Sequence, residues 1–304
     1  MGSGLDAVTG AFSFTGRAIA ARLLDDGRQV VTLVRRSPAM NPFGGRIRVA
    51  ETSLDDPAAL TSALNGVDTL YNTHWIRFER GDVTFELAIA RTLRLIEAAR
   101  QAGVRRLVHI SVVNASESAP TDYFIAKARL EDRVRQSGLS HAIVRPTLTY
   151  GDGDILVNNL CWVLRRFPAF GVPGDGRYRF QPVHVDDVAA IAVRAGNQSA
   201  DLETDAAGPD IMTFDEFVRL LAKAIGRRVW LVHMPPMLSL GASRMLSPLV
   251  RDVLLTAHEV TELTASLLVS ADPPAGTIRL ADWAVAHAGQ LGRSYHSELD
   301  RHFR

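Results

Sequence analysis

Tyr123 and Lys127 lie four residues apart in the stretch YFIAK, so a helix would place a phenol and an ammonium on one face, one turn apart. A nearby ammonium lowers the pKa of a phenol and prepares it to give or take a proton near neutral pH. The chain contains 34 lysines and arginines, yet its only lysines are Lys127 and Lys223. We therefore interpret Tyr123 as a general acid or base with Lys127 as its partner. The alternative is an ordinary exposed pair at helical spacing.

A glycine-containing turn near the start of the chain, in AVTGAFSFTGRAIAARL, is the second feature with chemical potential. A strand, Gly10, a short loop, Gly16 and an amphipathic helix follow one another, which is the context of a dinucleotide-binding loop. In such a loop the N-terminus of the helix holds the pyrophosphate. Ser13 stands where a middle glycine is usual, and it is small enough for close approach. The alternative is a plain strand-to-helix turn.

Two arginines, Arg35 and Arg36, end the apolar stretch QVVTLVRR. A site for NAD usually has an acidic residue at this place, because a carboxylate binds the ribose hydroxyls. Two guanidinium groups instead suit a 2′-phosphate, through paired and charge-assisted hydrogen bonds. The sequence therefore predicts NADP(H) as the preferred cofactor, with NAD(H) as the alternative. The other interpretation of the two arginines is that they are solvated surface residues without a role in cofactor binding.

Strand and helix patterns alternate through the first half of the chain, which predicts an α/β fold with a Rossmann-type, doubly wound parallel sheet. The expected strands cover 7–10, 29–36, 46–52, 67–73, 105–113 and 141–150, with helices between them. Helical patterns dominate afterwards, including a capping box at Thr213 and Glu216. We expect an NAD(P)-binding domain over 1–150, to which 180–200 return, and a smaller, mainly helical substrate part over 151–304.

Composition excludes several functional classes. The formal net charge of +1 gives no field that would attract nucleic acid or an acidic membrane. The sequence contains no run of 18 apolar residues, so no membrane-spanning helix is predicted. The single Cys161 fits a reducing compartment, so we expect a cytoplasmic protein. His74 and His109 are not spaced as metal ligands, and no metal site is predicted.

Five segments in order, TGAFSFTGR, LVRR, YFIAK, IVRPTLTYG and PVHVDDVA, resemble the short-chain dehydrogenase/reductase superfamily. They cover about residues 1–195. The resemblance is to its atypical or extended branch, which includes NmrA-like proteins and the NADPH-binding accessory subunit of respiratory complex I. It implies a Rossmann fold, an NAD(P) cofactor and oxidoreductase chemistry.

The resemblance also implies roles for individual residues. Tyr123 would be the general acid or base, and Lys127 would hold the nicotinamide ribose hydroxyls. A set of cofactor-binding residues would border the pyrophosphate, the adenosine and the nicotinamide. This set comprises Gly10, Ser13, Phe14, Thr15, Gly16, Arg35, Arg36, Ser53, Leu54, Thr73, His74, Ser111, Lys127, Pro146 and Thr147.

The sequence departs from the family where a serine or threonine usually polarises the substrate oxygen. Val113 occupies that position, and only Asn114 and Ser116 offer a nearby polar replacement. Losing one aligned hydrogen-bond donor typically costs about 10²–10³ in rate. In addition, the family usually has small residues beside the cofactor at the place of His74 and Trp75, and these bulky side chains would narrow the site.

Three functions remain open at this point. The first is an NADP(H)-dependent oxidoreductase that acts on a carbonyl or hydroxyl of a small molecule. The second is a catalytically silent NADP(H)-binding redox sensor or assembly subunit. The third is a nucleotide-sugar epimerase or dehydratase, whose diphosphate Arg165, Arg166, Arg177 and Arg179 would bind. A small-molecule substrate is the expected partner, and a homodimer through two long helices is an alternative that the family suggests.

Overall fold

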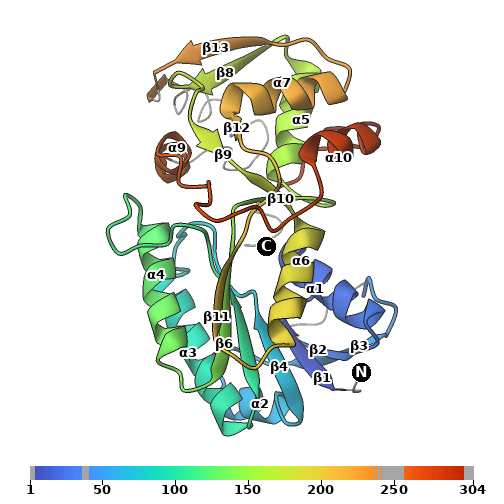
Figure 1. Ribbon diagram of the computed structural model, residues 1–304, viewed down its shortest axis with the longest axis vertical. Coiled ribbons are helices and arrows are strands. Elements are labelled where there is room, and N and C mark those ends of the chain that lie inside the picture. The colour runs from blue at the N-terminus through green and yellow to red at the C-terminus, as the bar shows by residue number, and fades with distance from the viewer. Residues whose placement is uncertain (1–3, 36–40, 236, 239–240, 242–256, 298–304) are drawn as a thin grey trace. The chain divides into compact units, whose positions relative to one another are not determined.

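The computed structural model describes residues 4–35, 41–235, 237–238, 241 and 257–297 (Figure 1). The chain forms two compact units. The first comprises Met1–Pro146 and Val185–Ala206, and the second comprises Thr147–His184 and Ala207–Arg304. The chain leaves the first unit at Pro146, a few residues before the predicted position 150, and its return extends to Ala206.

Seven parallel strands form the sheet of the first unit, in the order β11-β6-β5-β4-β1-β2-β3. The strands are β1 (Leu5–Thr9), β2 (Gln29–Val34), β3 (Ile47–Glu51), β4 (Val67–Asn72), β5 (Arg106–Ile110), β6 (Ser140–Pro146) and β11 (Leu202–Ala206). The order reverses at β1, which has β2 on one side and β4 on the other. The predicted Rossmann-type, doubly wound sheet is therefore confirmed.

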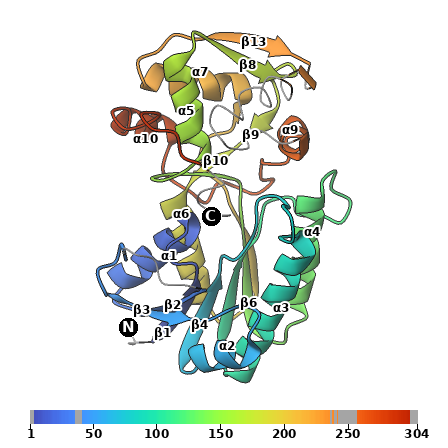
Figure 2. The ribbon, with the colours of Figure 1, turned by 180° about the vertical axis from the view of Figure 1, so that it is seen from behind.

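Helices cover both faces of this sheet. They are α1 (Phe14–Asp25), α2 (Pro57–Ala63), α3 (Phe85–Gln101), α4 (Asp122–Arg135) and α6 (Val185–Gly196). Helices α2, α3 and α4 lie on one face, and α1 and α6 lie on the other, as Figure 1 and the opposite view in Figure 2 show. Side-chain caps fix where two of them start, since Asp56 accepts from the N–H of Ala59 and Thr84 from the N–H of Leu87.

A buried apolar layer joins the sheet to helices α2 and α3. It includes Leu70 and Leu107 from the strands, Leu60 from α2 and Leu95 from α3, none of them exposed to solvent. Strands buried on both faces carry near-continuous apolar runs, as QVVTLV of β2 does. The rigid layer fixes the carboxyl ends of the strands, from which the site residues project.

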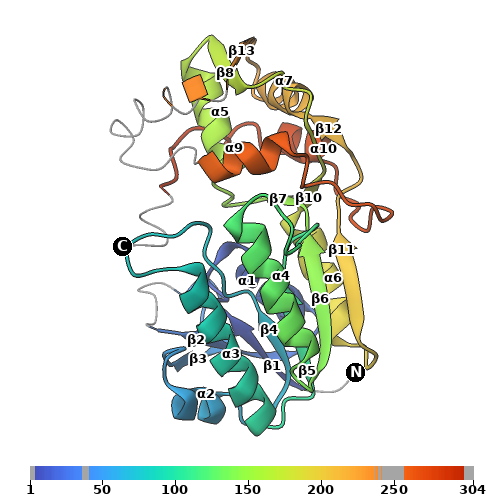
Figure 3. The ribbon, with the colours of Figure 1, turned by 90° about the vertical axis from the view of Figure 1, so that its left-hand side faces the viewer.

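Two predicted strands differ from the structure, and a third strand was not predicted. The strand expected over 105–113 ends at Ile110. The strand expected over 141–150 consists of β6 and β7 (Leu148–Tyr150), which belong to different sheets. Strand β11, with the sequence LETDA, was not predicted. It lies at the edge of the sheet (Figure 3), where its Glu203 forms ion pairs with Arg135 and Arg145.

The second unit combines helices with three short strand pairs. Its helices are α5 (Leu156–Arg166), α7 (Phe214–Ala224), α9 (Ala257–Thr264) and α10 (Leu280–Ala286). The pairs are β7 with β10 (Pro182–His184), β9 (Arg179–Phe180) with β12 (Met212–Thr213), and β8 (Ala169–Pro173) with β13 (Trp230–Met234). These strands are too short to show a sequence period. The predicted capping box of Thr213 and Glu216 begins α7.

The core of the second unit combines aliphatic side chains with a few aromatic rings. Phe180 and Phe217 meet edge to face with ring centroids 4.9 Å apart, and Trp283 packs against Tyr150 at 5.2 Å. In the portions of the chain that the structure describes, no helix has the length and apolar character needed to cross a bilayer.

Candidate functional site

The carboxyl ends of β1 and β4 meet at the point where the strand order reverses. Doubly wound sheets bind ligands at this point. Thr73 joins the two ends, because its N–H donates to Thr9 Oγ1 at 2.8 Å and its hydroxyl donates to Thr9 O at 2.5 Å. The same hydroxyl lies 3.8 Å from the place that a Cβ on Gly10 would occupy. The predicted residues Gly10 and Thr73 are thus neighbours at the switch point.

The turn after β1 requires both of its glycines. Gly10 has a φ of 64°, which L side chains rarely adopt. A Cβ on Gly16 would lie 2.2 Å from Gly10 O, so only glycine lets the helix approach the turn this closely. Ser13 closes the turn, since its N–H and its hydroxyl both donate to Gly10 O, at 2.8 and 2.7 Å. The serine therefore replaces the usual glycine without opening the loop.

The first turn of α1 offers an anion site. Ser13 is the N-cap residue, and its side chain makes no capping hydrogen bond. The N–H groups of Phe14, Thr15 and Gly16 consequently have no acceptor within the helix. No acidic side chain lies in this first turn. Free amides and the positive end of the helix dipole together favour a phosphate group here.

Arg35 directly follows β2, beside the end of β1, and its side chain is exposed. The predicted Arg36 lies outside the described residues. A charged guanidinium at this edge of the sheet can contact an anionic group that is bound at the neighbouring helix N-terminus.

Ser53 and Leu54 follow β3, in the turn that leads to α2. The hydroxyl of Ser53 accepts a hydrogen bond from the N–H of Asp55 at 3.1 Å, and Leu54 packs against the apolar layer of the sheet. Asp55 is engaged by Arg91 and Arg94, each at 2.6 Å. The local contacts of this pair are thus those of a structured turn.

Helix α4 carries Tyr123 and Lys127, as the sequence predicts. The ammonium of Lys127 donates to Ile110 O at 3.0 Å, at the carboxyl end of β5, and the side chain is 2% exposed. Burial lowers the pKa of Lys127 to about 7, and the charge of Glu131 acts in the opposite direction. The ammonium is therefore held at a fixed place on the strand edge and titrates close to neutral pH.

An aromatic cluster surrounds Tyr123. Trp75 stacks on Phe85 with ring centroids 5.8 Å apart, and both rings meet Tyr123 edge-on, at 6.1 and 6.0 Å. The Nζ atom of Lys127 lies 4.3 Å from the centroid of Trp75. Sequence reasoning placed Trp75 only near the cofactor region. Its contacts with both members of the Tyr–Lys pair have no signal in the local sequence.

Two histidines lie beneath this cluster and are linked through Asn72. The main-chain N–H of His74 donates to Asn72 Oδ1 at 3.1 Å, and the side-chain Nδ2 of Asn72 donates to His109 Nδ1 at 3.1 Å. Burial lowers the pKa of His74 to about 4 and that of His109 well below its usual value. Both imidazoles are therefore neutral at physiological pH. Among the described residues, no group of three or more His, Cys, Asp or Glu is placed to hold a metal ion.

Ser111 and Val113 follow β5. The N–H of Ser111 donates to Val144 O at 2.8 Å, and its Oγ is buried without a partner among the described residues. Val113 is 1% exposed, and its N–H donates to Pro146 O at 3.0 Å, which places Pro146 beside this segment. The position thus contributes no polar side chain. The hydroxyl of Ser116 is hydrogen-bonded to that of Ser118 at 2.9 Å in an exposed part of the loop.

Thr147 belongs to the second unit, where its hydroxyl donates to Gln181 O. Two of the arginines considered for a sugar diphosphate, Arg165 and Arg166, also lie there. Arg165 donates to Leu291 O and Ala288 O, and Arg166 donates to Trp162 O and Gly292 O. These side chains bind main-chain carbonyls of their own unit, and the contacts give no support to a diphosphate role.

The residues at the switch point fit a dinucleotide. The glycine turn leaves no space for a Cβ at Gly16, and the first turn of α1 presents unpaired amides. Ser111 Oγ is a buried hydroxyl without a partner among the described residues, and the Lys127 ammonium has a backbone carbonyl as its hydrogen-bond acceptor. Polar groups that are desolvated and incompletely paired are suited to bind the hydroxyls of a ligand.

Comparison with known proteins agrees with this geometry. Residues 10–159 match a protein family described as NAD(P)H-binding. A (4-alkanoyl-5-oxo-2,5-dihydrofuran-3-yl)methyl phosphate reductase of Streptomyces griseus is 33% identical over 228 residues, which cover 72% of this chain and 73% of that protein. The chain belongs to the atypical branch of the short-chain dehydrogenase/reductase superfamily.

A further relative and a solved structure are also similar to this chain. A mitochondrial NADH dehydrogenase (ubiquinone) 1 alpha subcomplex subunit 9 of Arabidopsis thaliana is 28% identical over 73% of this chain, but the chain spans only 58% of the length of that relative. The triphenylmethane reductase of Citrobacter sp., solved with NADP(H), has the same fold. Its TM-score is 0.75 and its identity 20%, over 93% of this chain and 99% of that structure. The superfamily thus assigns NAD(P)H binding and reductase-type chemistry at a coarse level.

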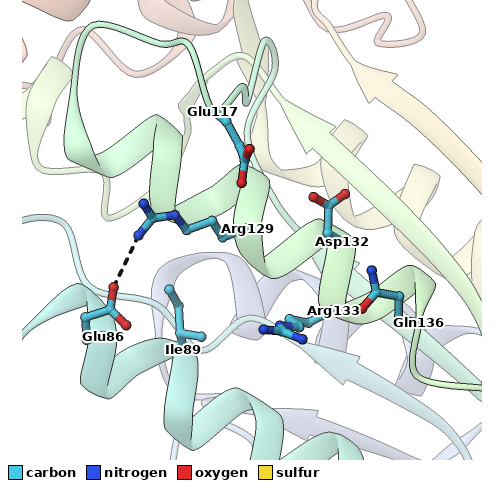
Figure 4. Close-up of a pocket in the computed structure, with 7 residues that line it drawn as sticks. All are labelled: Glu86, Ile89, Glu117, Arg129, Asp132, Arg133 and Gln136. Carbon is cyan, nitrogen blue, oxygen red and sulfur yellow. Dashed lines mark hydrogen bonds and ion pairs between the residues drawn. The ribbon is translucent and has the colours of Figure 1, made fainter.

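A separate hollow of about 470 Å³ lies on the surface of α3 and α4 (Figure 4). Its lining is mostly charged and consists of Glu86, Ile89, Glu117, Arg129, Asp132, Arg133 and Gln136. Arg129 and Glu86 form an ion pair of 3.4 Å across it. It includes neither Tyr123 nor Lys127, so it is not part of the site at the sheet edge.

Proposed function

We propose that this protein is an NADP(H)-dependent oxidoreductase that acts on a carbonyl or hydroxyl group of a small molecule, with Tyr123 transferring the proton. The observation that carries the proposal is the buried ammonium of Lys127, fixed by Ile110 O one helical turn from Tyr123. When bound, NADPH supplies or accepts a hydride at its nicotinamide ring.

The environment of Tyr123 supports its role. Trp75 and Phe85 contact its ring edge-on and restrict its orientation, which keeps the hydroxyl at a defined place. A protonated Lys127 stabilises the phenolate form of Tyr123, since opposite charges attract strongly where water is excluded. The proton can then pass between Tyr123 and the substrate oxygen near neutral pH.

The choice of NADP(H) rests on Arg35 at the end of β2, where a site for NAD usually has an acidic residue. A guanidinium binds a 2′-phosphate through charge-assisted hydrogen bonds. The triphenylmethane reductase, which has the same fold, was solved with NADP(H), and this supports the same preference.

The test is NADPH oxidation by the purified protein against a panel of aldehydes, ketones and quinones. We expect the Tyr123→Phe variant to lose about 10²–10⁴ in kcat while it retains NADPH binding. Tyr178→Phe is the matched control, since Tyr178 lies in the second unit and packs on Phe214. Turnover that is indifferent to Tyr123→Phe would refute the proposal.

A second candidate is a catalytically silent NADP(H)-binding protein that acts as a redox sensor or assembly subunit. It is favoured by the apolar Val113 and by the similarity to the complex I subunit. Tight NADPH binding without turnover on any member of the panel would support it, and robust turnover would exclude it.

The location and the assembly state remain predictions. The single Cys161 is buried, and burial raises the pKa of its thiol to about 12, so it is an inert side chain that suits a reducing compartment such as the cytoplasm. A homodimer is to be tested by light scattering of the purified chain.

A further inference from the structure

The site lacks the hydroxyl that usually shares the substrate oxygen with the tyrosine. Val113 places an isopropyl group at that position, and Ser116 is hydrogen-bonded to Ser118. Proton transfer by Tyr123 alone leaves the charge that develops on the oxygen without a second donor. Such a donor typically contributes about 10²–10³ in rate. Ser111 Oγ and Trp75 Nε1 are both buried donors without a partner among the described residues, and of the two Trp75 has a ring in contact with Tyr123.

Trp75 carries a donor of the right kind in the right place. Its Nε1 atom is buried and has no hydrogen-bond acceptor among the described residues. An indole N–H can only donate, so this atom needs an acceptor that the described residues do not provide. A buried donor without a partner is costly, and in native structures such a group has a specific explanation, of which a catalytic role is one.

The position of the indole is fixed on three sides. Its ring stacks on Phe85 at an interplanar angle of 12°, meets Tyr123 edge-on with centroids 6.1 Å apart, and lies 4.3 Å from the ammonium of Lys127. The Trp75 ring therefore directly contacts the side chain to which the proton transfer is assigned. Its neighbour His74 also has an Nε2 atom without a partner among the described residues, but in that part of the chain no ring contact connects it to Tyr123.

We propose that the indole N–H of Trp75 is the second hydrogen-bond donor to the substrate oxygen, in place of the hydroxyl missing at Val113. The inference rests on the proposed oxidoreductase function. In the direction of reduction, the carbonyl carbon gains a hydride from NADPH and the π pair moves to the oxygen, which takes the proton of the Tyr123 hydroxyl. The N–H of Trp75 stabilises the negative charge on that oxygen until the proton arrives.

The first test is Trp75→Phe, which keeps an aromatic ring between Phe85 and Tyr123 but removes the N–H. We expect kcat with the best carbonyl substrate to fall about 10²-fold, while the NADPH dissociation constant stays within threefold of wild type. Trp230→Phe is the matched control, because Trp230 lies on β13 and is 80% exposed. A Trp75→Phe variant that keeps its kcat, in a protein that Tyr123→Phe inactivates, overturns this inference alone. A wild-type protein without turnover overturns the proposed function and this inference together.

The second test does not depend on activity. The chain has four tryptophans, so a ¹H–¹⁵N spectrum contains few indole signals, and Trp75→Phe identifies that of Trp75. NADP⁺ and the carbonyl compound form a complex that cannot react, since both are oxidised. We expect the carbonyl compound to move the Trp75 signal downfield in the NADP⁺-bound protein, as hydrogen bonding does. A purely structural Trp75 leaves its signal in place and contradicts the proposal.

Discussion

The Nζ atom of Lys127 lies 4.3 Å from the centroid of the Trp75 ring and donates its hydrogen bond to the carbonyl of Ile110. A buried ammonium is thus held by an aromatic face and a main-chain oxygen. Glu131, one turn further along α4, favours the charged form of Lys127 by electrostatic attraction. This arrangement sets the charge of Lys127, and several consequences can be measured.

Lys127 makes stability depend on pH. Burial lowers its pKa to about 7, from 10.5 in the unfolded chain, so the unfolded protein binds more protons between these values. The cost of burying the charged ammonium of Lys127 is fully present below pH 7 and absent above about pH 10.5. Between these two values the free energy of unfolding rises by up to about 1.4 kcal/mol per pH unit. Lys127→Met should flatten this rise in urea unfolding at pH 7, 8 and 9.

Lys223→Met is the control for this experiment, because Lys223 is exposed on α7 and is the other lysine of the chain. It should keep the wild-type dependence on pH. Equal slopes for wild type and Lys127→Met would show that the ammonium is better solvated than its burial indicates.

Arg145 supports α4 through a buried ion pair. The carboxylate of Glu131 is 2% exposed and accepts two hydrogen bonds from Arg145, at 2.9 and 2.7 Å. Arg145→Met leaves a buried charge with one remaining cation, Arg135, and should lower the free energy of unfolding by about 3 kcal/mol. Adding Glu131→Gln should restore part of the loss, since it removes that charge.

Arg129→Met on the same helix gives the comparison. Its pair with Glu86 spans 3.4 Å at the surface, with half or more of each side chain exposed, and should contribute less than about 1 kcal/mol. Similar losses for the two arginines in urea unfolding would contradict the buried-pair interpretation.

The glycine turn should be intolerant of a single methyl group. Gly16→Ala places a Cβ 2.2 Å from Gly10 O, a main-chain atom that cannot move without opening the turn. We expect at least a tenfold weaker affinity for NADPH in fluorescence titration, together with a lower Tm. Gly27→Ala, at the other end of α1, has a φ of 75° but open space around its Cβ. It should destabilise the protein while leaving NADPH binding unchanged, and equal effects of both variants on affinity would argue against the site.

Arg35 should discriminate between the two nicotinamide cofactors. A charge-assisted hydrogen bond contributes about 1.5–3 kcal/mol, so Arg35→Gln should weaken NADPH binding about 10- to 100-fold and leave NADH binding unchanged. Arg48→Gln, on an exposed position of β3, serves as the control. An equal loss of affinity for both cofactors in thermal-shift titration would exclude contact with the 2′-phosphate.

Features that depend on neighbouring residues were predictable from the sequence. The turn from Gly10 to Gly16, the capping box at Thr213 and the placement of Tyr123 and Lys127 on one helix follow from local backbone geometry and the helical period. Alternation of strands and helices over the first half gave the parallel sheet, because short connections leave few other arrangements.

Contacts between distant segments were decided by the tertiary structure alone. The acidic segment β11 is a strand because its backbone pairs in parallel with β6, and Arg135 and Arg145 form ion pairs with its Glu203, neither of which is encoded by local propensity. Packing of the loop after β4 against α3 and α4 brought Trp75 onto Phe85, Tyr123 and Lys127. The sequence by itself determined the chemical groups and the elements that carry them. Their mutual distances, burial and unpaired polar atoms arise only when the sheet and its helices pack, since these are properties of residues far apart along the chain.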